Sequence, residues 1–224
     1  MFCKNESSIV EAMRVVVFPM TNAVLFPGVT LPLQILEPQA SQIFRDIKEQ
    51  GLLLAVSLAV PQSKRQFSLN AICGAGSVEA LGQFGEEGQT DILIHGQKRV
   101  RLCSLVQAQP YFIMEAEPLE PDQPVSSGGT QRSFEELRAL IKTWVFIHPK
   151  ISSELSLAFD GFEDFGELTD FFVFHFLNKA REKQEYLNCT HAGYRAEMLA
   201  QFLEMDLLRL RGNVVGPSIK RILH

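Results

Sequence analysis

A thiol and an imidazole lie only two positions apart in this sequence, at Cys189 and His191. Such a pair can attack an acyl carbon when the imidazole accepts the thiol proton and a third group holds the ring in place. Two residues apart on a helix or a turn, however, the side chains point in different directions. No nearby group is evident to orient the ring. A hydrolase that uses Cys189 is therefore the weakest of the functional hypotheses, and it is excluded if that thiol is buried and unreactive.

A cluster of carboxylates could also act as paired acid and base. Glu163, Asp164, Glu167 and Asp170 lie within eight positions of one another. Acidic residues gather at the amino termini of helices because they complement the helix dipole. We interpret the cluster as the start of a helix and expect no catalytic residue in it.

Metal and cofactor chemistry has no support in the spacing of the ligand-type residues. The five histidines show neither an HExxH pattern nor the Cys/His spacing of a zinc site, and the four cysteines form no CxxC pair. We expect no metal and no cofactor. The cysteines are interpreted as buried thiols, and His175, which lies among phenylalanines, as a histidine satisfied in the core. Gly74 and Gly76 lack the third glycine of a dinucleotide-binding loop and are given a packing role.

One basic stretch, Lys98 to Arg101, could contact nucleic acid. Strand alternation would place Lys98 and Val100 on one face and Arg99 and Arg101 on the other, so the charge is divided. The net charge of -5 also argues against a broad phosphate-binding surface. Nucleic-acid binding is not expected, although an RNA-binding β-barrel is kept as the alternative function.

The elements that must position these residues begin with the proline-rich stretch from Val15 to Ile35. Proline cannot donate to a sheet ladder, so Pro19, Pro27 and Pro32 divide this apolar stretch into short strands of an irregular barrel. A helix with a terminating Gly51 should follow at 38–50. Further strands are expected at 52–60, 72–81, 90–102 and 111–119, with a polar loop at 61–70 and a bulge at Gly96.

After residue 118 the composition changes to a stretch rich in proline, glycine and serine, which is typical of a linker. The segments beyond it have helical periodicity, with helices expected from 134, from 153, and at 167–177, 179–187 and 191–210. The sequence predicts a β domain at 1–118, a linker at 119–130, a helical bundle at 131–211 and a flexible tail at 212–224. No apolar run is long enough to cross a bilayer, so we expect no membrane contact and a cytoplasmic protein.

Four stretches resemble the amino-terminal domain of the ATP-dependent Lon proteases. They are the valine-rich strand Val15–Pro19 followed by Phe26-Pro27-Gly28, the apolar-x-Gly-x-x-Arg stretch that starts at Ile94, the strand Tyr111–Leu119, and the segment Leu177–Leu187. Their order and spacing extend the resemblance over residues 13–211. The resemblance implies an α+β fold, in which a small β-barrel related to the PUA barrel precedes an α-helical bundle.

The resemblance also implies a function in polypeptide recognition. Full-length Lon needs a Walker A loop and a Ser-Lys pair, and this sequence has neither, which indicates a non-enzymatic adaptor or holdase. The expected partners are unfolded or tagged polypeptides and an ATP-dependent protease, and a homo-oligomer is also allowed. The binding groove is expected near the two Phe-Pro turns; each residue there could equally belong to the barrel core. The candidate binding residues are Phe18, Pro19, Met20, Leu25, Phe26 and Pro27.

Overall fold

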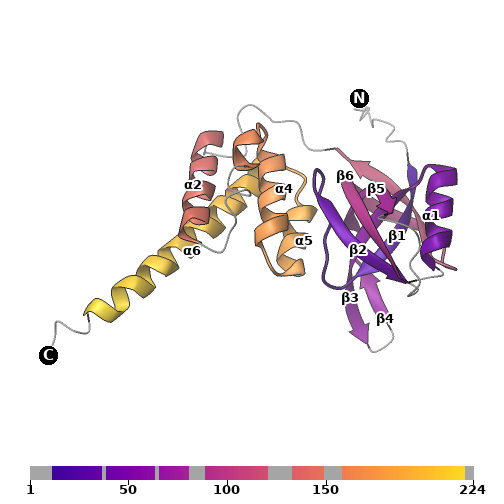
Figure 1. The fold of residues 1–224 in the computed structure, drawn as a ribbon, viewed down its shortest axis with the longest axis horizontal. Coiled ribbons are helices and arrows are strands. Elements are labelled where there is room, and N and C mark those ends of the chain that lie inside the picture. Colours follow the sequence, from indigo (N-terminus) through magenta and orange to yellow (C-terminus); the bar gives the residue numbers. More distant parts are fainter. Residues whose placement is uncertain are drawn as a thin grey trace, which may run out of the picture. The chain divides into compact units, whose positions relative to one another are not determined.

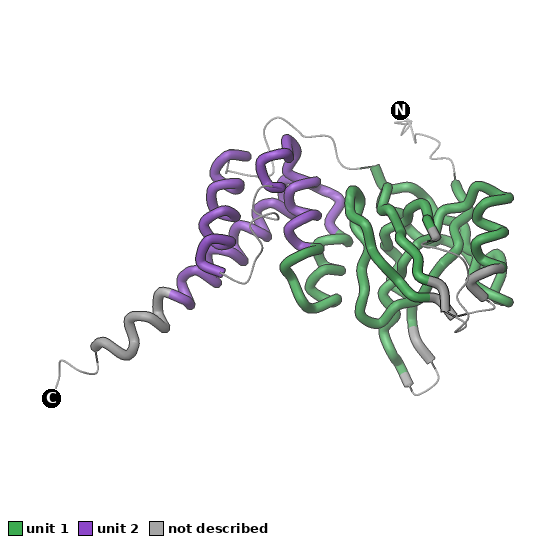
Figure 2. The backbone as a smooth tube through the Cα atoms, in the orientation of Figure 1, with its two compact units in different colours: residues 1–120, 174–188 green, residues 121–173, 189–224 purple. Residues whose placement is uncertain are grey.

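The computed structural model describes residues 12–36, 39–63, 66–80, 89–120, 133–148 and 158–219. Its backbone divides into two compact units, which Figure 2 shows in green and purple. The first unit, the strand unit, consists of residues 1–120 with 174–188. The second unit, the helical unit, consists of residues 121–173 with 189–224. The sequence predicted one helical bundle at 131–211, whereas the structure groups residues 174–188 with the strands.

The strand unit is organised around a closed ring of strands (Figure 1). The ring contains β1 (Met13–Met20), β3 (Leu53–Ser63), β5 (Ile72–Ala80), β6 (Gln89–Gln107) and β7 (Phe112–Leu119). The order is β1-β7-β6-β5-β3 with antiparallel neighbours, and a parallel pairing of β1 with β3 closes it. Outside the ring, β2 (Thr30–Leu36) pairs with β6 and β4 (Gln66–Leu69) pairs with β3. The predicted irregular barrel and α+β class are confirmed.

The barrel core is made of small and β-branched side chains. Its buried members are Val15, Val17, Ala55, Cys73, Ala75, Val100 and Ala116. Such side chains fit a narrow barrel because they fill little volume and lose little rotamer freedom on a strand. Burial raises the pKa of the Cys73 thiol to about 12, so this thiol stays protonated at neutral pH.

Two glycines of the barrel wall allow the chain between β1 and β2 to lie directly against the sheet. A Cβ atom on Gly74 would stand 2.0 Å from the carbonyl oxygen of Leu25, and one on Gly96 would stand 2.0 Å from that of Phe26. Gly96 also exchanges backbone hydrogen bonds with this segment, since its N–H donates to Val29 (2.8 Å) and its carbonyl accepts from Gly28 (2.9 Å). Only glycine permits this approach, so the packing role predicted for Gly74 is confirmed.

Of two sequence-based expectations about the strands, one is confirmed and one is wrong. The predicted bulge at Gly96 is present, because Gly96 faces Gly76 while Lys98 faces Ala75, which leaves Gln97 as the extra residue. The predicted polar loop at 61–70 is wrong: β3 continues to Ser63 and pairs with β4. The polar composition of this segment predicted a loop, but a strand in a hairpin outside the barrel can also be polar because both of its faces can be exposed.

Two helices belong to the strand unit. Helix α1 (Gln39–Gln50) ends at Gly51, whose φ of 65° is the left-handed conformation expected at a helix end. Helix α5 (Ala180–Asn188) is joined to the barrel by two side chains. Gln184 Nε2 donates to the Ile72 carbonyl (2.8 Å), and Arg99 Nε donates to the Leu187 carbonyl (3.1 Å). Both contacts bind the helix to the barrel wall.

The helical unit contains α2 (Phe134–Ile147), the short η1 (Phe159–Gly161), most of α4 (Phe165–Phe176) and α6 (Ala192–Ile219). Helix α2 begins with a capping box in which Ser133 and Glu136 exchange hydrogen bonds. The sequence predicted a flexible tail from residue 212, whereas the backbone of α6 stays helical to Ile219. The helix expected from residue 153 and the linker residues 121–130 lie outside the described residues.

An aromatic cluster holds the helical unit together. The ring of Trp144 on α2 meets Phe172 of α4 edge to face at 5.2 Å, and its Nε1–H donates to Asp206 of α6 (2.8 Å). Phe159 of η1 contacts the same Phe172 at 6.2 Å. The single tryptophan therefore contacts both other long helices of this unit and can report on its folding.

Replacing Gly96 by alanine should unfold the strand unit. The added methyl would meet the Phe26 carbonyl oxygen, a backbone atom that cannot move without opening the barrel. We expect Gly96→Ala to lower the free energy of unfolding by more than about 4 kcal/mol, measured by urea denaturation followed by circular dichroism. Gly161→Ala is the matched control, since a Cβ there would meet no atom within 4 Å. Equal stability of the two variants would contradict this account of the barrel.

Thiol reactivity should separate the cysteines in the folded protein. In a Cys3→Ser background, the exposed Cys103 should react rapidly with an aromatic disulfide reagent. The buried Cys73 should react on the order of a hundredfold more slowly, because it is reached only when the barrel opens. Cys103→Ala should remove the fast phase. Rapid modification of Cys73 in native buffer would disprove the buried core position.

Candidate functional site

The six candidate binding residues do not share one surface. Leu25 and Phe26 have no exposed area, so they are barrel core and leave the set of candidate contact residues. Phe18, Pro19, Met20 and Pro27 are half-buried and keep part of their surface in solvent. Leu25 and Phe26, which lie over the two wall glycines, are therefore core residues, as the alternative interpretation held. A role of the other four residues in polypeptide binding stays a prediction.

An exposed apolar segment near the end of β6, on the other side of β7 from β1, was missed by sequence reasoning. Val17 pairs with Phe112, so residues 18–20 run past the beginning of β7. The end of β6 flanks the same end of β7, because Leu105 pairs with Met114. Leu105 is 55% exposed and Val106 is 44% exposed. We call Phe18, Met20, Leu105 and Val106 the apolar rim.

The rim residues on β6 were missed because the strand was predicted to end at Leu102. Two adjacent apolar residues, Leu105 and Val106, cannot both face a barrel interior on a regular strand. Register shifts occur on β6 between Leu102 and Ser104 and between Leu105 and Gln107. The sequence did contain a signal for the longer strand. Two adjacent apolar residues shortly before Pro110 indicate that the strand continues and that at least one of the two is exposed.

The loop between β6 and β7, which follows the rim residues Leu105 and Val106, is held in place. The Tyr111 hydroxyl donates to the Asp46 carboxylate on α1, and Gln107 Nε2 donates to the Tyr111 carbonyl (3.2 Å). Burial and the hydrogen bond to Asp46 raise the pKa of Tyr111 to about 12, so the phenol stays neutral and remains a donor. The rim therefore rests on a fixed support.

The basic stretch does not form a nucleic-acid surface. The structure buries Arg99 and Val100 and leaves Lys98 and Arg101 exposed. Residues 98–101 pair in regular register with β5, so Arg99 and Val100 lie on opposite faces and the predicted division of charge between the two faces is confirmed. Arg99 is 6% exposed, donates to the Leu187 carbonyl and lies 5.9 Å from the centroid of the Phe26 ring. The burial of Arg99 was not predicted, because it depends on α5, which covers the outer face of β6 at this residue. Two separated surface charges give no support to RNA binding.

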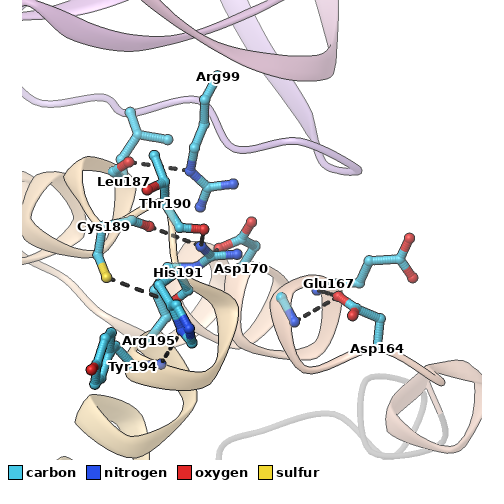
Figure 3. A network of polar contacts seen from close by, with 11 residues as sticks. Arg99, Asp164, Glu167, Asp170, Leu187, Cys189, Thr190, His191, Tyr194 and Arg195 are labelled. Carbon is cyan, nitrogen blue, oxygen red and sulfur yellow. Dashed lines mark hydrogen bonds and ion pairs between the residues drawn. The ribbon is translucent and has the colours of Figure 1, made fainter. Parts of the chain in front are cut away.

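The Cys189–His191 pair has no catalytic geometry (Figure 3). The Cys189 thiol lies 3.6 Å from the backbone carbonyl of His191, to which it donates, and not against the imidazole. The Nδ1 atom of His191 accepts from the backbone N–H of Tyr194 (3.3 Å) at the start of α6. The imidazole therefore caps a helix, and the thiol has no base beside it.

The acidic cluster divides between a helix cap and a buried ion pair. Asp164 Oδ1 accepts from the backbone N–H groups of Gly166 (2.7 Å) and Glu167 (3.0 Å), which confirms the interpretation as a helix start. Asp170 lies 3.2 Å from Arg195 Nε, and both side chains are buried. Arg195 Nη1 also donates to the carbonyls of Cys189 and Thr190 (Figure 3). This network joins α4 to α6.

A hydroxyl, an imidazole and a carboxylate do meet on the outer surface of the barrel. Thr30 Oγ1 lies 3.0 Å from His95 Nδ1, and Glu79 Oε2 lies 3.1 Å from His95 Nε2. A carboxylate only accepts, so Nε2 carries the proton and Thr30 donates to Nδ1. The nearby amides of Gly28 and Gly96 are both used in backbone hydrogen bonds and cannot stabilise an oxyanion. We interpret the three residues as a structural hydrogen-bond network that links strands β2, β6 and β5.

The remaining histidine and cysteine predictions have mixed outcomes. Cys73 is buried as expected, but Cys103 is exposed, and His175 is exposed rather than part of the core. Partial burial and the nearby Lys183 lower the pKa of His175, which keeps the ring neutral at pH 7. Within the described residues no group of three or more His, Cys, Asp and Glu side chains could hold a metal ion.

Comparison with known proteins relates the fold to solved structures. The chain is similar to the Lon N-terminal domain protein from Xanthomonas campestris, with a TM-score of 0.61 and 20% identity over 84% of this chain and 96% of that one. It is also similar to the N-terminal domain of Lon protease from the Mycobacterium avium complex, with a TM-score of 0.61 and 15% identity over 86% and 98% of the two chains. Both comparisons support the fold.

Sequence comparison gives the family. The chain is 25% identical to Lon protease of Cytophaga hutchinsonii over 217 residues, which are 93% of this chain and 25% of that protein. It spans about a quarter of the length of the curated relatives it matches. None of the described helices is long and apolar enough to cross a membrane. The model of the ATP-dependent protease La (Lon) substrate-binding domain matches residues 14–205, and the chain therefore belongs to that family.

Proposed function

We propose that these 224 residues form a non-catalytic polypeptide-recognition module that binds apolar segments of unfolded or tagged proteins at the apolar rim. The observation that carries the proposal is the match of a substrate-binding domain model to residues 14–205. The exposed apolar residues at one end of the barrel support the choice of surface.

The chemistry of the rim suits a ligand without a fixed sequence. Phe18, Met20, Leu105 and Val106 offer apolar surface without a charged group, so their contacts have no strict geometry. Met20 is unbranched and polarizable and can adapt to different side chains. Burying about 300 Å² of apolar surface would contribute on the order of 7 kcal/mol before the entropy cost of binding. Affinities in the micromolar range are expected.

A binding module of this kind acts on a client through a partner. The sequence printed here holds neither a Walker A loop nor the peptidase modules of a Lon protease. We propose that it holds a client as an adaptor or holdase, and that an ATP-dependent protease acts on the client afterwards. One module can recognise a client while another unfolds it, provided that the second module can reach the client that the first one holds.

Introducing charges into the rim should weaken client binding. The variant is the double substitution Met20→Glu and Leu105→Glu, which places two charges on the surface that must be desolvated. The affinity for a labelled, permanently unfolded polypeptide, measured by fluorescence anisotropy, should fall at least about tenfold. For the unmodified protein, binding should survive high salt because the contacts are apolar.

Phe146→Glu is the matched control for this experiment. Phe146 is the most exposed large apolar residue of the described chain, at 85%, and lies in the helical unit. This variant should bind the polypeptide normally. If both variants bind equally well, the rim is not the binding surface. If only an RNA control binds and high salt abolishes that binding, the proposed function is wrong.

A further inference from the structure

Helix α6 presents two different faces. The buried face contains Arg195, Ala196, Leu199, Ala200 and Leu203 and packs within the helical unit. At about 100° of rotation per residue, a second set of residues falls on the opposite side. We call this set the α6 stripe: Tyr194, Met198, Gln201, Met205 and Leu208.

The α6 stripe is largely open to solvent. Met205 is 54% exposed and Leu208 is 65% exposed, values that are unusual for large apolar side chains on a packed helix. Tyr194 and Gln201 are also exposed, and Met198 is half-buried. The stripe is about 21 Å long, since a helix rises about 1.5 Å per residue. Figure 1 shows α6, in yellow, continuing beyond its crossing with α2.

The spacing of the stripe indicates what kind of surface it fits. Its members follow one another at intervals of four, three, four and three residues, which is the repeat of a coiled-coil seam. Apolar residues occupy four of the five positions, and Gln201 is the polar exception at the centre. One polar residue in such a seam fixes the register and the number of helices. A stripe with this pattern packs against another helix.

We propose that the second helix is α6 of another copy of this chain, packed parallel to the first. In a parallel pair, a residue that flanks the seam faces the residue five positions later on the second helix. Glu204 then faces Arg209 of the second copy, and two-fold symmetry makes this contact twice. A carboxylate accepts several hydrogen bonds, so Glu204 keeps its contacts within its own chain.

The flanking charges disfavour the antiparallel arrangement. An antiparallel pair centred on Gln201 would bring Glu197 of one helix against Glu204 of the other. These like charges repel, and the symmetry of the pair would again double the effect. Both arrangements place Gln201 against Gln201 of the second copy, where two amides can exchange hydrogen bonds. The flanking charges therefore select the parallel geometry.

Sedimentation equilibrium of the full chain tests the proposal. A seam of two heptads is short, so we expect a dimer with a Kd of about 1 to 100 μM. The apparent mass should rise from the 25.2 kDa of a monomer toward twice that value as the concentration increases. A mass that stays at the monomer value to about 1 mM would overturn the proposal.

Two sets of variants identify the interface. Leu208→Glu should raise the dimer Kd at least about tenfold, whereas the control Leu105→Glu, on the apolar rim, should leave it unchanged. An unchanged Kd for Leu208→Glu would exclude the α6 stripe. Trp144 donates a hydrogen bond to Asp206 of α6, so its fluorescence shows whether the helical unit of each variant is folded.

A charge exchange decides the direction of the helices, even if Leu208→Glu does not fold. Glu204→Arg should weaken the parallel dimer, and the double variant with Arg209→Glu should restore it. An antiparallel dimer would instead be strengthened by Glu204→Arg, because that change replaces a repulsion by an attraction, and this result would overturn the proposed geometry. Polypeptide binding at the rim is measured in a separate experiment. If the rim does not bind polypeptide, the result of the dimer experiment still stands.

Discussion

The contact between the chain at Leu25 and Phe26 and the two wall glycines, Gly74 and Gly96, is the constraint on which the barrel depends. The carbonyl oxygens of this segment lie where the Cβ atoms of any other residue would be. Both side chains are fully buried, and the backbone hydrogen bonds of Gly28 and Val29 with Gly96 start β2 in register with β6. A larger residue at either glycine would push this segment away from the sheet.

That contact also explains the position of Arg99. With Phe26 buried, the guanidinium group lies near its ring on one side and donates to the end of α5 on the other. A cation near the last carbonyls of a helix is stabilised by the helix dipole. Arg99 therefore connects the barrel to α5 of the strand unit. Because its guanidinium group is buried in these contacts, it adds no positive charge to the surface. The same burial that organises the fold removes the evidence for an RNA-binding surface.

The two proposed interaction surfaces lie on different units and use different physics. The apolar rim consists of partly exposed side chains near strand ends, and it suits ligands of variable sequence. The α6 stripe is a regular seam on a helix whose other face is anchored by buried residues, and it suits one partner in one register. Recognition of many clients and assembly with one partner can therefore be changed independently by mutation.

The sequence by itself determined the local features of this protein. Prolines and glycines placed the ends of β1 and α1 and the bulge at Gly96, and apolar periodicity located the described helices. These signals are local because they follow from backbone geometry and from the repeat of each element. Only the tertiary structure decided that Leu25 is core while Met20 is partly exposed, that Arg99 is covered, and that Asp170 is paired with Arg195. Exposure of a side chain depends on which distant element covers its face, and periodicity along one segment carries no information about that partner.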